Sequence, residues 1–455
     1  MVTVPSRWLR FWFALVVAVA VSLVPPSALA QRVQIIRDTE IERTVLDYSV
    51  PVFRAAGLDP ASVEIYLVRD NTINAFVAGG QRMFLNTGLL MQSQSPNQLI
   101  GVIAHEVGHI EGGHLSRVHD AMRNASVEAI IGLVAGIAAG IATGRADVGS
   151  AIARAGEETA LRSFLRYSRT QEGAADSAAM RLLDATGQSS RGLLEFLEML
   201  EDQELLMVGR QDPYLRTHPV TRERIDALRA HLSRSRHADA PSPPGFEAKH
   251  ARMVAKLTGF LQAPDLVLRR YPESDTSIEA RYARAVAWYR RPDLDRALSE
   301  IETLLRLEPQ NAYFHELKGQ MLFEHGRPGE ALAPYETAAS LMPDAPLLRF
   351  ALAQVQIAMD RPDLLDDAVR NLEAGLLRDR RNSAAWRQLA IAHGRQGNMG
   401  ESALAQAEEA LLTGRADAAV FHAGKAQQLL PQGSRGWLQA QDVERAAEQQ
   451  QRRRN

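Results

Sequence analysis

Cysteine is absent from all 455 residues of the sequence. This absence excludes disulfide bonds, a cysteine nucleophile, thiolate metal sites and iron–sulfur clusters. Any metal site must therefore be built from histidine and carboxylate side chains. A chain without cysteine is also compatible with an oxidising compartment, but this alone does not locate the protein.

The sequence also has no large excess of positive or negative charge: its formal net charge is −2 at pH 7. Nothing in this balance demands a nucleic acid or an anionic membrane, and we expect no nucleic-acid partner. The hydrophobic share of 46% and the charged share of 23% are ordinary for a globular protein. At about 100–200 residues per domain, the length indicates two or three domains.

The N-terminus has the pattern of a signal peptide. Arg7 and Arg10 precede the apolar run Phe11–Val24, which is within the roughly 7–15 residues of a signal core and shorter than the ~20 that span a bilayer. The small-x-small pattern of residues 27–30 predicts cleavage after Ala30 and export to the periplasm. An uncleaved anchor is the alternative, and the lack of cysteine excludes a lipoprotein.

Residues 31–232 are expected to form the first folded domain. A helix is predicted from Ile41 to Val52, followed by β-prone segments at 63–68, 73–78 and 83–86. The Gly79-Gly80 pair between the last two segments predicts an antiparallel hairpin.

A well-marked helix follows the hairpin. Ser95 is a good N-cap, Pro96 suits the first helical position, and Gln98 lies three residues after the cap. Apolar residues then recur at helical spacing. We expect the helix to continue to Arg123, so that His114, predicted to be structural, and His119, predicted to be exposed, lie on it.

This helix carries His105-Glu106-Val107-Gly108-His109. Histidines at i and i+4 share one helix face, so both can reach one Zn²⁺ at about 2.0–2.1 Å. Glu106 lies beside the open position of the metal, where it can take a proton from water and pass it to the leaving amine. A pair of surface histidines is the alternative interpretation.

A third metal ligand is predicted at Glu172. Glu172 and Asp176 are four residues apart in a helix expected from Phe164 to Thr186, with Gly187 as its C-cap. Two like charges on one helix face repel unless a cation lies nearby. We predict that Glu172 binds the metal and that Asp176 accepts a hydrogen bond from the free ring N–H of a metal-binding histidine. An exposed acidic stripe is the alternative.

These motifs resemble the gluzincin-type metallopeptidases related to HtpX. The resemblance rests on the run from Asn74 to Leu89, on His105–His109 with His114 five residues later, and on Glu172-x-x-x-Asp176. The signal peptide and the 34-residue repeat of the second half, seen in Pro309 and Pro343, narrow it to BepA-like periplasmic zinc metalloproteases. The resemblance implies a mostly α catalytic domain with a small sheet, one Zn²⁺ per chain, peptide hydrolysis, and a role in the quality control or assembly of outer-membrane proteins.

Two further sites follow from the same resemblance. The strand Asn74–Ala78 is similar to the edge strand on which such proteases hold the substrate backbone, and an ordinary core strand is the alternative. Thr217-His218-Pro219 is similar to a loop after the catalytic helices. His218 is expected either to steady the tetrahedral intermediate or to fill the fourth zinc position without substrate. A structural His218, with Arg224 in an ion pair, is the alternative.

Residues 129–144 carry no charge and are rich in isoleucine, alanine and glycine. They are too short to cross a membrane comfortably. We interpret them as a buried helix, with a mobile lid or a peripheral membrane contact as the alternatives.

The second half of the chain contains repeats. Pro309 and Pro343 are 34 residues apart, as are Ala297 and Ala331, and Gly319 lies between them. This period and these small residues match the tetratricopeptide pattern, with about four units. We expect a linker at 233–247, repeats at 248–440 that bind proteins on a concave surface, and a polar tail at 441–455. A helical bundle without true repeats is the alternative.

The predicted fold is therefore mainly α: a zincin-type metalloprotease domain with a small β-sheet, followed by an α-solenoid of tetratricopeptide-like repeats. The predicted function is an exported zinc endopeptidase that cleaves misfolded or misassembled envelope proteins. Its predicted partners are polypeptide substrates and, through the repeats, outer-membrane assembly proteins. The alternative is a chaperone or assembly adaptor whose protease activity is latent.

Overall fold

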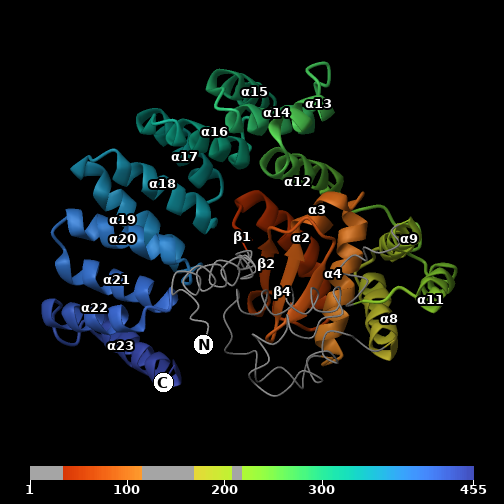
Figure 1. The fold of residues 1–455 in the computed structure, drawn as a ribbon, viewed down its shortest axis with the longest axis horizontal. Coiled ribbons are helices and arrows are strands. Elements are labelled where there is room, and N and C mark those ends of the chain that lie inside the picture. Colours follow the sequence, from red (N-terminus) through yellow and green to blue (C-terminus); the bar gives the residue numbers. More distant parts are fainter. Residues whose placement is uncertain (1–33, 115–168, 207–217, 455) are drawn as a thin grey trace, which may run out of the picture.

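The computed structural model describes residues 34–114, 169–206 and 218–454. The predicted signal peptide at 1–30, His119 and the segment 129–144 lie outside these residues. The chain forms a mixed α/β unit followed by an arc of paired helices, whose inner side faces the sheet (Figure 1). Within the described ranges, no helix is both long enough and apolar enough to cross a membrane.

A four-stranded sheet forms the centre of the N-terminal unit, with the spatial order β1-β2-β4-β3. The strands are β1 (Ile35–Ile36), β2 (Glu64–Val68), β3 (Ala75–Ala78) and β4 (Arg82–Asn86). β2 and β4 are parallel, and the other two pairs are antiparallel. The predicted hairpin is confirmed: β3 and β4 pair across Gly79 and Gly80, which both have positive φ. The two-residue strand β1 was not predicted.

Helices pack against the sheet and against one another around it (Figure 1). They are α2 (Thr39–Ala55), α3 (Thr87–Gln92), α4 (Pro96–Glu111), α8 (Arg169–Ala185), α9 (Arg191–Leu206) and α11 (Arg222–Leu232), with a 3-10 turn at Pro60–Ser62. The expected start of α4 is confirmed, because Ser95 Oγ accepts from the amide of Gln98. Gly187, with φ +72°, lies in the turn that follows the end of α8, as predicted.

One hydrophobic core joins these elements. It contains Val45 and Tyr48 from α2, Met83 from β4, Ile103 from α4 and Leu183 from α8. Because α4 lies between the sheet and the pair α8 and α9, nearly all of its side chains up to His109 are buried. The central place of α4 fixes the position of the His105–His109 motif.

The second half consists of helices that pair in sequence order. They are α12 (Phe246–Leu261), α13 (Pro264–Arg270), α14 (Ile278–Arg290), α15 (Leu294–Leu307), α16 (Ala312–Glu324), α17 (Pro328–Leu341), α18 (Pro346–Ala358), α19 (Pro362–Leu376), α20 (Ser383–Arg395), α21 (Met399–Leu412), α22 (Ala416–Leu429) and α23 (Arg435–Arg454). From α14 onward each helix packs mainly on its neighbours in the chain, whereas α12 packs mainly on α14. This confirms the predicted solenoid of helix pairs.

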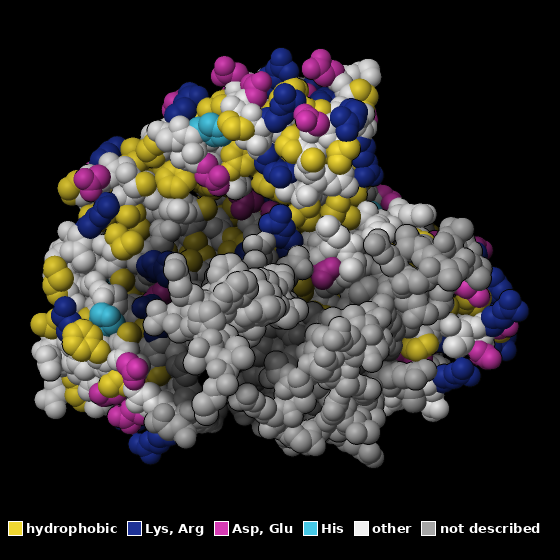
Figure 2. Space-filling model, in the orientation of Figure 1, with side chains coloured by type: hydrophobic (Ala, Val, Ile, Leu, Met, Phe, Trp, Pro, Cys, Tyr) yellow, Lys and Arg dark blue, Asp and Glu magenta, His cyan; other side chains and the backbone are white. Residues whose placement is uncertain are grey.

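The small residues of the repeat pattern lie where two helices approach closely. A Cβ on Gly319 of α16 would lie 2.6 Å from Cδ2 of Tyr335 on α17. Ala331 and Ala338 of α17 are fully buried. The glycine and the alanines therefore permit the close packing of α16 and α17. On the visible face, Lys and Arg are interspersed with Asp and Glu over the repeats (Figure 2).

Two segments that the sequence predicts as a linker and a tail have defined positions. Residues 233–247 lie along the N-terminal unit, where Ser189 Oγ donates to the carbonyl of Ala238 and Ser235 Oγ donates to Asp184. Residues 441–454 belong to α23, in which Val443 and Ala447 are buried.

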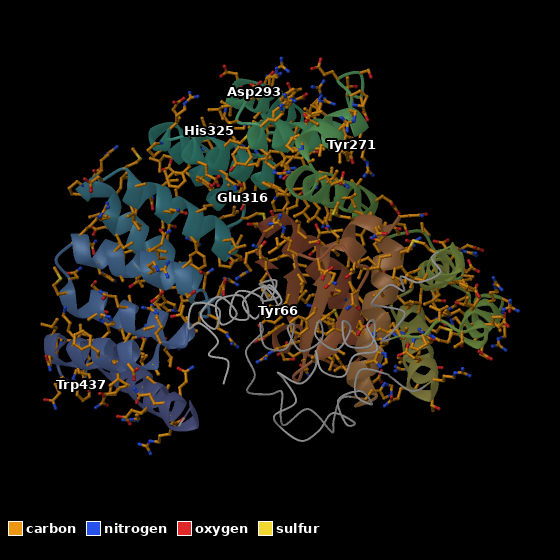
Figure 3. All side chains as sticks on the ribbon, in the orientation of Figure 1. Tyr66, Tyr271, Asp293, Glu316, His325 and Trp437 are labelled. Carbon is orange, nitrogen blue, oxygen red and sulfur yellow. The ribbon has the colours of Figure 1, made fainter. Side chains whose placement is uncertain are left out.

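A buried network of charges joins α2 to the first repeat helices. The ammonium of Lys256 on α12 is 2.8 Å from Asp38 and 3.5 Å from Glu40, both at the start of α2. Tyr282 on α14 donates a 2.8 Å hydrogen bond to Glu40. Thr39 donates to Glu316 on α16, also at 2.8 Å. Glu316 lies where the arc of repeats meets α2 (Figure 3).

We expect this network to make the stability of the protein depend on pH. Burial raises the pKa of Glu316 to about 7, helped by Asp38 and Glu40 and opposed by Lys256 and the hydrogen bond from Thr39. The folded protein therefore binds a proton that the unfolded chain has lost, and stability falls as pH rises from about 5 through 7. Urea unfolding at several pH values should show a weaker fall for Glu316→Gln. An equal pH dependence in both proteins would contradict this.

Candidate active site

Helix α4 brings His105, Glu106 and His109 together at the centre of the N-terminal unit. All three side chains are fully buried. The Nε2 atoms of His105 and His109 are 3.1 Å apart. Their rings are nearly perpendicular, with centroids 4.7 Å apart. The four-residue spacing thus directs both Nε2 atoms to one point.

Helix α8 brings Glu172 to the same point. Its Oε1 is 3.3 Å from His109 Nε2, and its Oε2 is 3.3 Å from His105 Nε2. Glu172 is also buried. A carboxylate from a second helix therefore faces both histidines, as the prediction for a third ligand requires.

His218 adds a fourth nitrogen to the cluster. Its Nδ1 is 3.1 Å from Glu172 Oε1 and 3.4 Å from His105 Nε2. This side chain precedes α11 and is completely buried. His105, His109, Glu172 and His218 are a group whose candidate ligand atoms all lie within 4.8 Å of one another.

The distances in this cluster fit a tetrahedral metal. Four ligand atoms at about 2.0–2.1 Å from such a metal are about 3.3–3.4 Å apart. Four pairs of these atoms are 3.1–3.4 Å apart, close to this value, and all the ligand atoms lie within 4.8 Å of one another. Three imidazole nitrogens and a carboxylate that converge in a buried space form a donor set suited to a divalent cation.

Asp176 and Arg224 support the cluster from outside. Asp176 Oδ1 is 2.8 Å from His105 Nδ1, on the opposite side of the ring from Nε2. Arg224 donates to both oxygens of Asp176, at 2.6 and 2.9 Å, and its Nη1 lies 2.9 Å from Glu172 Oε2. The guanidinium also donates to the carbonyl of Pro219. Arg224 thus links the carboxylates of α8 to the segment that carries His218.

Comparison with known proteins agrees with this geometry. The model of Peptidase family M48 matches residues 36–232. These residues are similar to M48 peptidases, and we call them the M48 domain. The match spans most of the sheet, α4, α8 and the segment from His218 through α11, so it includes every residue of the cluster. The chain is therefore a metallopeptidase, and the predicted resemblance is confirmed.

Relatives extend the similarity beyond the M48 domain. The chain is 25% identical over 359 residues to the beta-barrel assembly-enhancing protease of Escherichia coli, covering 78% of this chain and 72% of the relative. It is 39% identical over 80 residues to protease HtpX of Salmonella arizonae, covering 17% of this chain and 26% of that protein. The crystal structure of YrrB, a TPR protein with an unusual peptide-binding site, is also similar. The match covers 39% of this chain and 91% of the YrrB chain, with 18% identity and a TM-score of 0.32.

The charges of the M48 site are strongly coupled. Burial opposes the charged form of His105, but Glu172 and Asp176 outweigh it and raise the pKa of His105 to about 9. Burial lowers the pKa of His109 to about 3, together with the neighbouring His105 and His218. Burial alone would raise the pKa of Glu172, but the histidines hold it well below its ordinary value. The cluster thus keeps the carboxylate ionised, as a metal ligand must be.

Glu106 has a different environment from Glu172. Neither of its carboxylate oxygens has a hydrogen-bond partner among the described residues, and His218 Nε2 lies 3.5 Å from Oε1. Burial raises the pKa of Glu106, against the lowering effect of His218 and His105. A buried carboxylate with unused acceptors and a raised pKa is suited to exchanging protons with water or substrate.

Two features of the site differ from what the sequence suggests. α4 ends at Glu111, and Gly113 has φ +60°, so the prediction that His114 continues the helix is wrong. His114 instead folds back until its Nδ1 is 2.9 Å from His109 Nδ1. Arg224 was expected in an ion pair only in the alternative interpretation of His218, and its partners Asp176 and Glu172 were not predicted. The Gly112-Gly113 pair is a helix-ending signal that could have revealed the turn.

Close packing of α4 on α8 depends on Gly108. A Cβ at this position would lie 2.7 Å from the carbonyl oxygen of Ala175, which belongs to the backbone of α8. We expect Gly108→Ala to push α8 away, lower the metal content and cost about 1–3 kcal/mol of stability. Metal analysis and urea unfolding would measure both effects.

Gly173→Ala is the matched control for this substitution. Gly173 also lies on α8, beside Glu172, but a Cβ there would meet nothing within 4 Å. This variant should bind metal normally and gain up to about 1 kcal/mol. Equal metal content in the two variants would show that the close approach of the helices does not matter.

Proposed function

We propose that this chain is an exported, zinc-dependent endopeptidase that cleaves misfolded or misassembled envelope proteins in the periplasm. The observation that carries the proposal is the buried convergence of His105, His109 and Glu172, next to Glu106 with both oxygens unused. Zinc is the metal proposed because two imidazoles and a carboxylate are its usual catalytic ligands, although such sites also accept other divalent ions.

Each residue has a distinct proposed role. Zinc, when bound, acts as a Lewis acid and lowers the pKa of water to about 7. His105, His109 and Glu172 hold the metal. Glu106 accepts a proton from the attacking water and donates it to the leaving amine. Asp176 accepts the Nδ1–H of His105, which keeps the Nε2 lone pair directed at the metal.

His218 is proposed to fill the fourth ligand position when no substrate is present. Its Nδ1 lies among the other ligand atoms, at the separation expected for a shared metal. With a metal bound, His218 would have to leave this position to admit a substrate carbonyl, and its imidazole could then steady the negative charge that develops on the substrate. His218→Ala should therefore change zinc affinity, activity or both. If neither changes, both roles are ruled out.

The edge strand β3 is the proposed contact for the substrate backbone. The backbone carbonyl of Asn74 accepts a hydrogen bond from the amide of Asn86 in β4. Along a strand, the backbone groups of successive residues point to opposite sides. The amides and carbonyls of Ala75 and Val77 are therefore directed away from β4. An unfolded segment can add to this edge as an extra strand. Such pairing recognises extended backbone and suits misfolded proteins as substrates.

The repeat domain, proposed to span 248–440, is the part suited to binding partner proteins. The relative from Escherichia coli is named for enhancing β-barrel assembly. We propose that the repeats of this chain likewise bind proteins of outer-membrane assembly. The second candidate function is an assembly adaptor with latent proteolysis, which is favoured by the complete burial of the ligand cluster with His218 among its atoms.

Purified protein from Gln31 to Asn455 and unfolded casein provide the test. We expect cleavage that stops after treatment with a chelator and returns when zinc is added. One metal per chain without cleavage would support the latent adaptor. Absence of both metal and cleavage would overturn the proposal.

A further inference from the structure

The two histidines of the motif have different partners on the side of the ring away from the cluster. Nδ1 of His105 faces the carboxylate of Asp176 at 2.8 Å. Nδ1 of His109 faces Nδ1 of His114 at 2.9 Å. We propose that His114 is a positioning residue that accepts the Nδ1–H of His109 and so holds its Nε2 ready to bind the metal. This inference rests on the proposed metal site.

The turn after α4 reverses the chain and places His114 against His109. Gly112 follows the last helical residue, and a Cβ there would lie 2.5 Å from Nε2 of the His114 ring. Gly113 has φ +60°, a conformation that other residues rarely adopt. The amide of His114 donates to the carbonyl of His109 at 3.2 Å. Both the backbone and the side chain of His114 are thus fixed against His109.

The contact between two imidazoles allows only two arrangements of its single proton. If His114 Nδ1 carries the proton, the neutral His109 ring must carry its own proton on Nε2, which points into the cluster and cannot then bind a metal. If His109 Nδ1 carries the proton, it donates to His114 and leaves the Nε2 lone pair free. Metal-binding histidines almost always donate their second N–H to an acceptor. His114 fills that role for His109, as Asp176 does for His105.

The competing explanation is that His114 has a purely structural role. Two substitutions distinguish this role from the positioning role. His114→Asn places an amide oxygen near the position of Nδ1 and keeps an acceptor. His114→Leu has a similar size but no acceptor. We expect His114→Leu to lower zinc affinity by about 10–100-fold, as other losses of such partners do, and His114→Asn to remain close to the wild type.

The experiment uses the whole mature chain and measures zinc affinity by competition with a chelator. The melting temperature of the metal-free proteins and the absorption spectrum of the Co²⁺-substituted proteins are recorded beside it. We expect equal metal-free melting temperatures and a changed Co²⁺ spectrum for His114→Leu only. Wild-type affinity in His114→Leu would overturn this inference alone. Equal losses of affinity and metal-free stability in both variants would assign His114 a structural role. A wild-type protein that binds no metal would overturn the proposed function as well.

Discussion

Glu106→Gln is expected to lower peptide-bond cleavage by about 10²–10⁴-fold, the usual contribution of general acid–base catalysis, without loss of the metal. Glutamine has nearly the size of glutamate but cannot accept the proton. Because Glu106 contributes no atom to the cluster of ligand atoms, the donor set should survive. Steady-state cleavage of a labelled unfolded protein, with metal analysis of the same samples, would measure both effects.

Glu111→Gln is the matched control on the same helix. Glu111 lies at the end of α4, where its partly exposed side chain pairs with Arg181. Its loss should leave cleavage unchanged. If Glu106→Gln retained full activity, Glu106 could not be the base. If that variant also lost its metal, the loss of activity would say nothing about proton transfer.

The second large effect is expected at the junction of the M48 domain and the repeats. Lys256→Met should lower the free energy of unfolding by about 3–5 kcal/mol, because removal of one partner leaves buried charges without compensation. Lys256 is 3% exposed and lies between Asp38 and Glu40. Burial lowers the pKa of Lys256, but the surrounding carboxylates raise it well above its ordinary value, so the ammonium is charged.

Lys249→Met is the comparison, since Lys249 lies on the same helix α12 and pairs with Asp47 at 2.6 Å. That pair is partly exposed to solvent, and its loss should cost at most about 1 kcal/mol. Urea unfolding followed by circular dichroism would measure both variants. Equal stability losses would show that the buried network does not hold the two parts together.

The core of the active site could be predicted because local periodicity specifies it. His105 and His109 share a helix face by their spacing, and Glu172 was recognised because an acidic pair on one face needs a nearby cation. The repeats were recognised by their 34-residue period. These signals lie within single helices or helix pairs, so they depend little on the tertiary structure.

What the sequence did not reveal depends on contacts between distant segments. His218 was predicted only through the family resemblance, because it is 113 residues from His105 and only tertiary packing brings the two rings together. Arg224 joins two carboxylates and a carbonyl that no sequence pattern places side by side. The contact of Thr39 with Glu316 spans 277 residues. β1 has two residues, too few to show a strand period.

The most direct test of the metal site is anomalous diffraction at the zinc absorption edge from crystals of the mature protein. The account predicts one strong peak per chain, about 2.0–2.1 Å from His105 Nε2, His109 Nε2 and a Glu172 oxygen. Without substrate, His218 Nδ1 should complete the tetrahedron. Protein crystallised with zinc that shows no peak among these atoms, or a peak elsewhere in the chain, would contradict the account.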